Sequence, residues 1–318
     1  MFAAAAAGEA PKCKLLRIED WAVRPDHYRP VVDGAVNGQK VGVLLDTGAS
    51  HSLILRAATG RLGLTRQPAH GYRTFGIGGE TQAEAVDINE FRIGKAVRKN
   101  WRVMVIGEHD FGDDVVVMLG EDFFHQVEIE FDLHSNAVRI FQAKDCQSAP
   151  LAYWSRQALD VPLHGSEKIL LTVAINGKPL RAMLDSGASY SLLAKVDAEE
   201  RGLKPGSPGV EPAGCVGGFG AKSVDSWTGQ FDTFAIGDEL IRNPRIRFAE
   251  LWAHTTVTET GSRVPNRLAG LPPMLLGADF LRSHRVLIAR SQRKMYFTYE
   301  GGTVFPPVTG RGCNARSQ

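Results

Sequence analysis

Residues 43–50 read Val-Leu-Leu-Asp-Thr-Gly-Ala-Ser, an apolar run that leads into an acidic turn. Residues 182–189 repeat the pattern as Ala-Met-Leu-Asp-Ser-Gly-Ala-Ser, so Asp46 and Asp185 stand at the same place in the two copies, 139 residues apart. One such turn is commonly structural, because Asp and Gly favour turns in any protein. Two copies with matching flanks indicate that two carboxyl groups are brought together.

The same separation aligns further landmarks in the two halves of the chain. Asn37-Gly38 corresponds to Asn176-Gly177, and each pair stands between apolar residues. This pattern indicates a β-hairpin, because Asn and Gly adopt the positive φ that a two-residue turn needs. Three glycine-containing segments recur in the same order, namely 75–79 with 214–218, 91–94 with 234–237, and 118–124 with 275–281. The chain is therefore expected to contain two copies of one structural unit.

An all-β fold with two homologous lobes follows from this repeat, and a pseudo-twofold axis is expected to relate them. The N-terminal lobe is placed at residues 15–145, the C-terminal lobe at 158–305, and the linker between them at 146–157. Residues 1–14 are expected to be disordered or the remnant of a signal peptide, and residues 306–318 to form a C-terminal tail.

Few helices are expected, since the 34 glycines favour turns and short strands. The expected helices are short and lie at 120–125, 195–201 and 277–283. Strands are expected at 127–131, 137–141, 286–289 and 294–299, and a loop at 251–273, where the second copy is longer.

The composition is that of a soluble globular protein, with 43% hydrophobic and 23% charged residues among 318. A net charge of +2, with both signs mixed along the chain, argues against a nucleic-acid-binding protein. We expect no membrane span, because no stretch approaches the roughly 20 apolar residues it needs. The nine histidines are scattered without metal-ligand spacing, so no metal or cofactor is expected.

Four cysteines allow three disulfide connectivities. Cys13 and Cys146 bracket the first repeat, which favours a bridge between them and leaves Cys215 to pair with Cys313. Two bridges would require an oxidising compartment, so a periplasmic or secreted protein is expected. Free thiols in a cytoplasmic protein are the alternative.

At this point the motifs resemble those of a known family. Residues 44–50 and 183–189 resemble the active-site turns of aspartic proteases, and 75–79 resembles the glycine-rich flap of the retroviral-type enzymes. Residues 119–123 and 276–280 resemble the segment that starts a short helix in the retropepsins. The resemblance covers about residues 30–142 and 165–299, in an order similar to bacterial two-lobed, single-chain aspartic proteases. It implies two retropepsin-like, pepsin-like acid-protease lobes of the closed β-barrel type.

The resemblance implies that Asp46 and Asp185 are the catalytic pair. Peptide hydrolysis needs an activated water and a proton for the leaving nitrogen, and two carboxyls that share one proton can supply both. Such sharing is established for aspartic proteases in general. The pair would be supported by the remaining turn residues, which are Thr47, Gly48, Ala49, Ser50, Ser186, Gly187, Ala188 and Ser189. Of these, Thr47 and Ser186 would bridge the lobes beneath the pair.

A flap over the substrate is also implied. It would comprise Tyr72, Phe75, Gly76, Ile77, Gly78 and Gly79, faced by Val216, Gly217 and Gly218 of the second lobe. Cys215 stands at the position equivalent to Gly76, so a disulfide there would tether the second flap. Ala49 and Ala188 replace the Ser or Thr that pepsin-like enzymes carry, from which we expect a dyad less acidic than that of pepsin.

The expected function is that of an aspartic endopeptidase acting on an extended peptide or protein substrate. Because one chain supplies both aspartates, a monomer is sufficient. A binding module for a peptide or an envelope protein, with little or no turnover, is one alternative. A highly selective processing protease is another.

Overall fold

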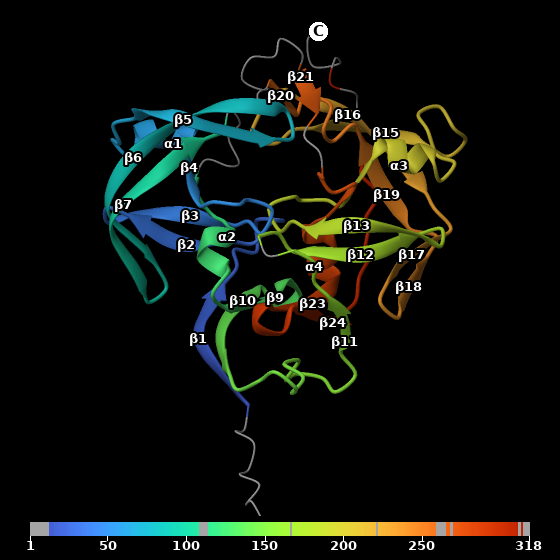
Figure 1. Ribbon diagram of the computed structural model, residues 1–318, viewed down its shortest axis with the longest axis horizontal. Coiled ribbons are helices and arrows are strands. Elements are labelled where there is room, and N and C mark those ends of the chain that lie inside the picture. Colours follow the sequence, from blue (N-terminus) through green and yellow to red (C-terminus); the bar gives the residue numbers. More distant parts are fainter. Residues whose placement is uncertain are drawn as a thin grey trace, which may run out of the picture.

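The structure, a computed structural model, describes residues 13–107, 114–165, 167–220, 222–258, 265–267, 270–310 and 313. Side chains are not described at 70–74, 82, 256–258 and 265–267. The expected N-terminal segment 1–14 and the end of the tail therefore lie largely outside the described residues. Two β-rich lobes stand side by side above a shared sheet (Figure 1).

The N-terminal lobe is a seven-stranded sheet. Its strands run in the order β2 (Val31–Val36), β3 (Gln39–Leu45), β8 (Val115–Leu119), β4 (Leu53–Leu55), β7 (Ala96–Ile106), β6 (Gly79–Ile93) and β5 (Gln67–Gly76). A further pairing of β2 with β6 closes the sheet into a barrel. The expected hairpin turn is confirmed, since Asn37 and Gly38 both have positive φ between β2 and β3.

The C-terminal lobe repeats this arrangement in a nine-stranded sheet. Its strands run in the order β15 (Glu211–Val216), β16 (Val224–Gln230), β19 (Arg245–Ala249), β14 (Leu192–Ala194), β22 (Met274–Leu276), β13 (Lys178–Leu184), β12 (Leu170–Ile175), β17 (Thr233–Ile236) and β18 (Glu239–Arg242). The strand equivalent to β6 is divided here into β16 and β17. Asn176 and Gly177 form the matching turn between β12 and β13.

A six-stranded sheet joins the lobes from below (Figure 1). Each lobe gives three strands, in the order β1 (Lys14–Ala22), β10 (Ala137–Lys144), β9 (Glu128–Asp132), β23 (His284–Ala289), β24 (Lys294–Tyr299) and β11 (Leu159–Pro162). The lobes meet where β9 pairs with β23. The strands expected at 127–131, 137–141, 286–289 and 294–299 are confirmed as β9, β10, β23 and β24.

The helices are few and short, as expected. The three expected helices are confirmed as α2 (Glu121–Phe124), α3 (Lys195–Glu199) and α4 (Ala278–Ser283). The sequence did not predict α1 (Arg56–Arg61) or the 3-10 turns η1 (Leu133–Ser135) and η2 (Arg290–Gln292). The expected loop at 251–273 contains two short antiparallel strands, β20 (Thr256–Thr258) and β21 (Pro265–Arg267), so the expectation was wrong there, and its residues 259–264 and 268–269 lie outside the described residues.

Both favoured disulfides are present, Cys13–Cys146 and Cys215–Cys313. The first joins the start of β1 to the end of β10, and the second joins β15 to the C-terminal tail. Two bridges suggest an oxidising, non-cytoplasmic compartment. Among the described residues, no helix has the length and apolar character needed to cross a membrane.

Candidate active site

Each of the two acidic turns follows a buried strand, at the boundary between the lobes. β3 runs parallel to β8, and the Asp46 N–H donates to the Leu119 carbonyl at 2.8 Å. In the second lobe β13 runs parallel to β22, and the Asp185 N–H donates to the Leu276 carbonyl at 2.9 Å. Each aspartate is therefore fixed by the strand that precedes the short helix of its own lobe.

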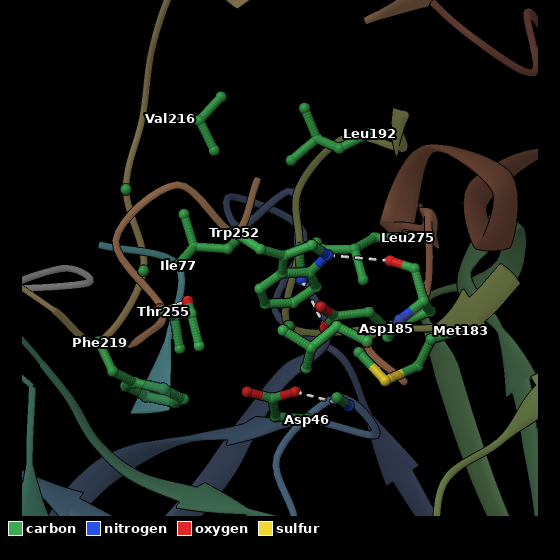
Figure 2. A pocket seen from close by; sticks show the side chains of 18 of the residues that line it. Asp46, Ile77, Met183, Asp185, Leu192, Val216, Phe219, Trp252, Thr255 and Leu275 are labelled. Carbon is green, nitrogen blue, oxygen red and sulfur yellow. Dashed lines mark hydrogen bonds between the residues drawn. The ribbon is translucent and has the colours of Figure 1, made fainter. Parts of the chain in front are cut away.

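The carboxyl groups of Asp46 and Asp185 line one cleft (Figure 2), and the charge of Asp46 acts on Asp185. The glycines of the two turns make this approach possible. A Cβ on Gly187 would lie 2.4 Å from Cγ of Asp46, and a Cβ on Gly48 would lie 2.4 Å from Cγ of Asp185. Each carboxyl thus occupies the space that a side chain on the opposite turn would need.

Thr47 and Ser186 link the lobes beneath the carboxyls in a reciprocal set of hydrogen bonds. The Thr47 N–H donates to Oγ of Ser186 and the Ser186 N–H donates to Oγ1 of Thr47, both at 3.0 Å. The Thr47 hydroxyl donates to the Leu184 carbonyl at 2.8 Å, and the Ser186 hydroxyl donates to the Leu45 carbonyl at 2.7 Å. All four bonds are buried, so they hold the two turns in one relative position.

Backbone N–H groups hold the carboxylates in place. Gly48 and Ala49 donate to Oδ1 of Asp46 at 2.8 and 3.1 Å, and Ala188 donates to Oδ1 of Asp185 at 3.1 Å. Ser50 and Ser189, the last residues of the two turns, line the cleft. The alanines contribute their N–H and no hydroxyl, as expected from the sequence.

Burial raises the pKa of both carboxyls. It is the main cause for Asp46, opposed by the charge of Lys168, by the N–H groups of Ala49 and Gly48, and by Arg29. For Asp185, burial and the neighbouring charge of Asp46 raise the pKa to about 7. Two carboxyls in contact do not both ionise, because their charges would repel. The pair therefore keeps one shared proton at pH values well above 3.8, the ordinary pKa of an aspartate.

Two cations flank the pair, and our sequence prediction missed them. Arg29 and Lys168 both line the cleft, both act on Asp46 and Asp185, and the Nζ of Lys168 donates to the Gly48 carbonyl of the other lobe. They are separated by 139 residues, the same separation as the two aspartates. That offset was the available signal, although Arg and Lys differ in shape and their flanking sequences do not match.

The cleft encloses about 630 Å³ between the carboxyls and the proposed flap. Its lining includes Phe75, Gly76 and Ile77 of the first lobe and Val216, Gly217 and Gly218 of the second. The two sides touch above the carboxyls, where the Gly220 N–H donates to the Ile77 carbonyl at 3.2 Å and the Lys222 N–H donates to the Gly78 carbonyl at 3.3 Å. Tyr72 lies in β5, but its side chain is outside the described residues.

The second-lobe side of the cleft is tied to the C-terminal tail. Besides the Cys215–Cys313 disulfide, Ala213 and Gly310 form a β-bridge, and the Cys313 N–H donates to Oδ1 of Asp225 at 2.6 Å. Cys215 itself lines the cleft. Segment 75–79 of the first lobe has no such tether among the described residues, so the two sides of the cleft are not equivalent.

A second acidic group lies near the dyad. The carboxylate of Glu121 in α2 is buried and pairs with Arg290 of the other lobe. Burial raises its pKa to about 7 in spite of Arg290 and Lys168, and burial likewise raises the pKa of Asp279 to about 6. Asp279 accepts hydrogen bonds from the Ser191 hydroxyl and N–H, which positions α4.

Stability is therefore expected to fall as the pH rises. Folding raises the pKa of Glu121, Asp279 and Asp185, so the folded state binds their protons more tightly. Their contribution to the free energy of unfolding is complete below the ordinary pKa values of 3.8 for Asp and 4.5 for Glu. It is lost as the pH rises past about 6 to 7. Urea unfolding should give a larger free energy at pH 5 than at pH 8.

The variant Glu121→Gln tests this assignment. It should reduce the difference in the free energy of unfolding between pH 5 and pH 8 by on the order of 3 kcal/mol, because it removes one of the titrating groups. An unfolding free energy that rises from pH 5 to pH 8, or a variant with the same pH dependence as the parent, would contradict the assignment.

The two repeated regions of the chain match one protein-family model. A family model described as "Aspartyl protease" matches residues 32–123 and 171–280. No curated protein matches the chain. Among the matching solved structures is a retropepsin-like aspartic protease from Rickettsia conorii, at 19% identity and a TM-score of 0.29, covering 42% of this chain and 95% of that one.

Proposed function

The chain belongs to the aspartyl protease family, and from this premise we propose that it is an endopeptidase with Asp46 and Asp185 as its catalytic pair. One observation carries the proposal. The two carboxyls, from the same position of two repeated lobes, line one cleft, and each lies against the glycine of the opposite turn. The fixed turns beneath them supply the preorganisation that such a pair needs.

The proposed chemistry uses one water molecule between the carboxyls. The ionised carboxyl takes a proton from this water while the water oxygen attacks the carbonyl carbon of the peptide bond. The protonated carboxyl gives its proton to the carbonyl oxygen. The tetrahedral intermediate then breaks its carbon–nitrogen bond as the nitrogen receives the proton taken from the water, and one hydroxyl of the intermediate gives its proton to the other carboxylate. An acid and an amine leave, and the dyad again holds one proton. The dyad acts as a unit, so no step needs a proton assigned to one named aspartate in advance.

The substrate that this cleft favours is an extended peptide. Backbone groups at the flap edges can pair with such a chain as an added strand. The walls are largely apolar, with Ile77, Val216, Leu192, Leu275 and Met183 among the lining residues (Figure 2). Closure of the flaps would exclude water from the reacting bond. Because both carboxyls come from one chain, we propose that the monomer is active.

Cleavage of a protein substrate tests the proposal. Unfolded casein incubated with the protein over a range of pH should give new peptides, detected by mass spectrometry. The Asp46→Asn and Asp185→Asn variants should lose this cleavage by about 10⁴-fold or more, since each removes half of a unit whose parts act together. Casein cleaved at the same rate by parent and variants would end the assignment.

The pH dependence of cleavage gives a second prediction. Activity requires one proton on the dyad, so it should persist to near-neutral pH and fall as the pH rises past about 7. A hydroxyl beside the outer carboxylate oxygen would stabilise the ionised form, so Ala49→Ser and Ala188→Ser should move the acidic limb of kcat/KM to lower pH. An optimum below about pH 3 for the parent would contradict this prediction.

The compartment that fits these disulfides is periplasmic or extracellular. We propose export of the chain to such a compartment, where Cys215 and Cys313 can oxidise and tether the second flap. Fractionation of cells that express the full-length protein, followed by thiol labelling, would locate it and report the state of both bridges.

A further inference from the structure

Arg247 lies on β19 and faces the cleft. Its neighbours Ile246 and Phe248 point to the opposite face of the strand and pack in the main core. Arg247 is the register partner of Leu192 on β14, and Leu192 belongs to the apolar cluster beside the cleft. Arg247 and Leu192 both line the cleft. The strand therefore carries a cation into a wall that is otherwise apolar.

The guanidinium of Arg247 is held in a fixed position. Its Nε donates to Oγ of Ser226 at 2.9 Å, and its Nη2 donates to the carbonyls of Ala213 and Cys215 at 2.7 and 3.0 Å. These partners are neutral. Within the described parts of the chain, no carboxylate forms an ion pair with Arg247. The guanidinium is partly removed from water, and this burial lowers the pKa of Arg247.

A desolvated cation without a counter-ion is costly to keep. Arg245, two residues earlier on the same strand, pairs with Glu211 at 2.7 Å. Arg247 instead opens onto the space where a substrate would lie. A carboxylate from the substrate would supply the missing partner, and the apolar wall would strengthen the resulting ion pair.

The pseudo-equivalent position in the N-terminal lobe is not charged. Met104 is the register partner of Leu53 there, as Arg247 is of Leu192, and the two leucines are separated by the repeat distance of 139 residues. Met104 does not line the cleft. The charge at this repeated position is therefore present on only one side of the cleft. This suits a peptide substrate, whose two directions along the chain differ.

The charge of the whole cleft points the same way. Arg29 and Lys168 line it together with Arg247, whereas its lining acids are the two aspartates, which share one proton. Three cations thus face a dyad of about one negative charge. The cleft is expected to attract anionic segments of a polypeptide.

We propose that Arg247 is a specificity-determining residue, which binds an Asp or Glu side chain of the substrate on the C-terminal-lobe side of the cleaved bond. The inference rests on the proposed peptidase function and narrows its substrate class to acidic peptides. Arg247 takes no part in bond cleavage itself. Its carboxylate partner comes from a side chain of the substrate rather than from the end of a peptide, because an endopeptidase cuts within a chain.

The first experiment maps the cleavage sites. Peptides made by digesting a denatured bacterial proteome are incubated with the full-length protein, and the products are sequenced by mass spectrometry. Asp and Glu should be enriched at one position on one side of the cut. The matched control is Arg245→Gln, on the same strand but outside the cleft, which should keep this enrichment. Arg247→Gln should lose it.

The second experiment uses a pair of cleaved peptides that differ only by Glu or Gln at the enriched position. The parent protein should prefer the Glu peptide by about tenfold or more in kcat/KM, and added salt should weaken the preference. Arg247→Gln, which keeps a donor without the charge, and Arg247→Met, which copies the other lobe, should bring the ratio to within about twofold of one. If Arg247 only holds β15, both variants will cleave both peptides less well at an unchanged ratio, and the proposal is overturned.

The failure of this inference can be told from failure of the peptidase function. Cleavage without an acidic preference would remove the role of Arg247 and leave the peptidase intact. If no peptide were cleaved, fluorescence anisotropy would measure binding of a labelled Glu-containing peptide library, and of the same library with Gln in place of Glu, to the parent and to Arg247→Gln. A preference for Glu in the parent alone would support the anion site without the hydrolysis. Equal binding by both proteins would overturn the site as well.

Discussion

Gly187→Ala is expected to lower kcat for peptide cleavage by at least about 100-fold. The backbone of Gly187 does not have positive φ, so alanine fits the local conformation. Its Cβ, however, would lie 2.4 to 2.5 Å from the carboxyl atoms of Asp46. The carboxyl must move away, and a displacement of about 1 Å in a reacting group costs on the order of 100-fold in rate.

The matched control is Gly60→Ala in α1, where an added Cβ would have no atom within 4 Å. This variant should keep kcat within about twofold, because exposed surface substitutions have small effects. Gly48→Ala should repeat the loss through Asp185, which lies 2.4 Å from the added atom. Circular dichroism would show whether each variant is folded. A folded Gly187→Ala protein with the parent's kcat would mean that the two turns do not enclose the dyad as described.

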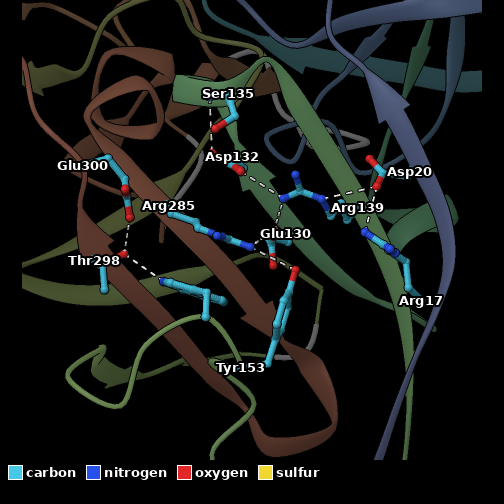
Figure 3. Close-up of polar contacts among 11 residues, drawn as sticks. Arg17, Asp20, Glu130, Asp132, Ser135, Arg139, Tyr153, Arg285, Thr298 and Glu300 are labelled. Atoms are coloured by element: carbon cyan, nitrogen blue, oxygen red, sulfur yellow. Dashed lines mark hydrogen bonds and ion pairs between the residues drawn. The ribbon is translucent and has the colours of Figure 1, made fainter.

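Glu130→Met is expected to lower the free energy of unfolding by on the order of 3 kcal/mol. Glu130 on β9 is fully buried, and its carboxylate pairs with Arg139 of β10 and with Arg285 of β23 (Figure 3). The distance from Oε1 to Nη2 of Arg285 is 3.0 Å. Because Arg285 belongs to the C-terminal lobe, the carboxylate joins both lobes within the shared sheet. Its removal would leave two partly buried cations competing for fewer acceptors.

The control for this prediction is Asp20→Asn. Asp20 also pairs with Arg139, at 3.4 Å, but its side chain is 47% exposed. Exposed pairs contribute little, so the loss should stay below about 1 kcal/mol. Urea unfolding of the parent and both variants gives the comparison. Equal effects of the two changes would show that Tyr153 and Asp132, which also bind these arginines, are sufficient.

Local patterns in the sequence were enough to predict much of the fold. The Asn-Gly turns, the strands after each short helix and the two-lobed order all depend on neighbouring residues or on the repeat. The segment Arg56–Arg61 was missed because it has no apolar period, and α1 forms there with Ala58 and Thr59 buried. Tertiary contacts decided that element.

The site was predictable where the two copies agree and not where they differ. Asp46 and Asp185 share their flanking residues, so the repeat alone brought them to attention. Arg247 lies in Arg-Ile-Arg-Phe-Ala, whose alternation also fits a strand with one face in solvent. Only the fold shows that this face borders the cleft, since the pairing of β14 with β19 cannot be read from the local sequence. The pairing of β1 with β10 and of β11 with β24 was likewise invisible from local pattern.

The covalent link between the lobes has a consequence for heredity. In an enzyme assembled from two identical subunits, any mutation appears on both sides of the axis, so a change that suits one end of a ligand is imposed on the other. Here β9 and β23 pair across the axis within one polypeptide. Each half of the gene can therefore vary alone, and Met104 and Arg247 are different residues at one repeated position of the two lobes.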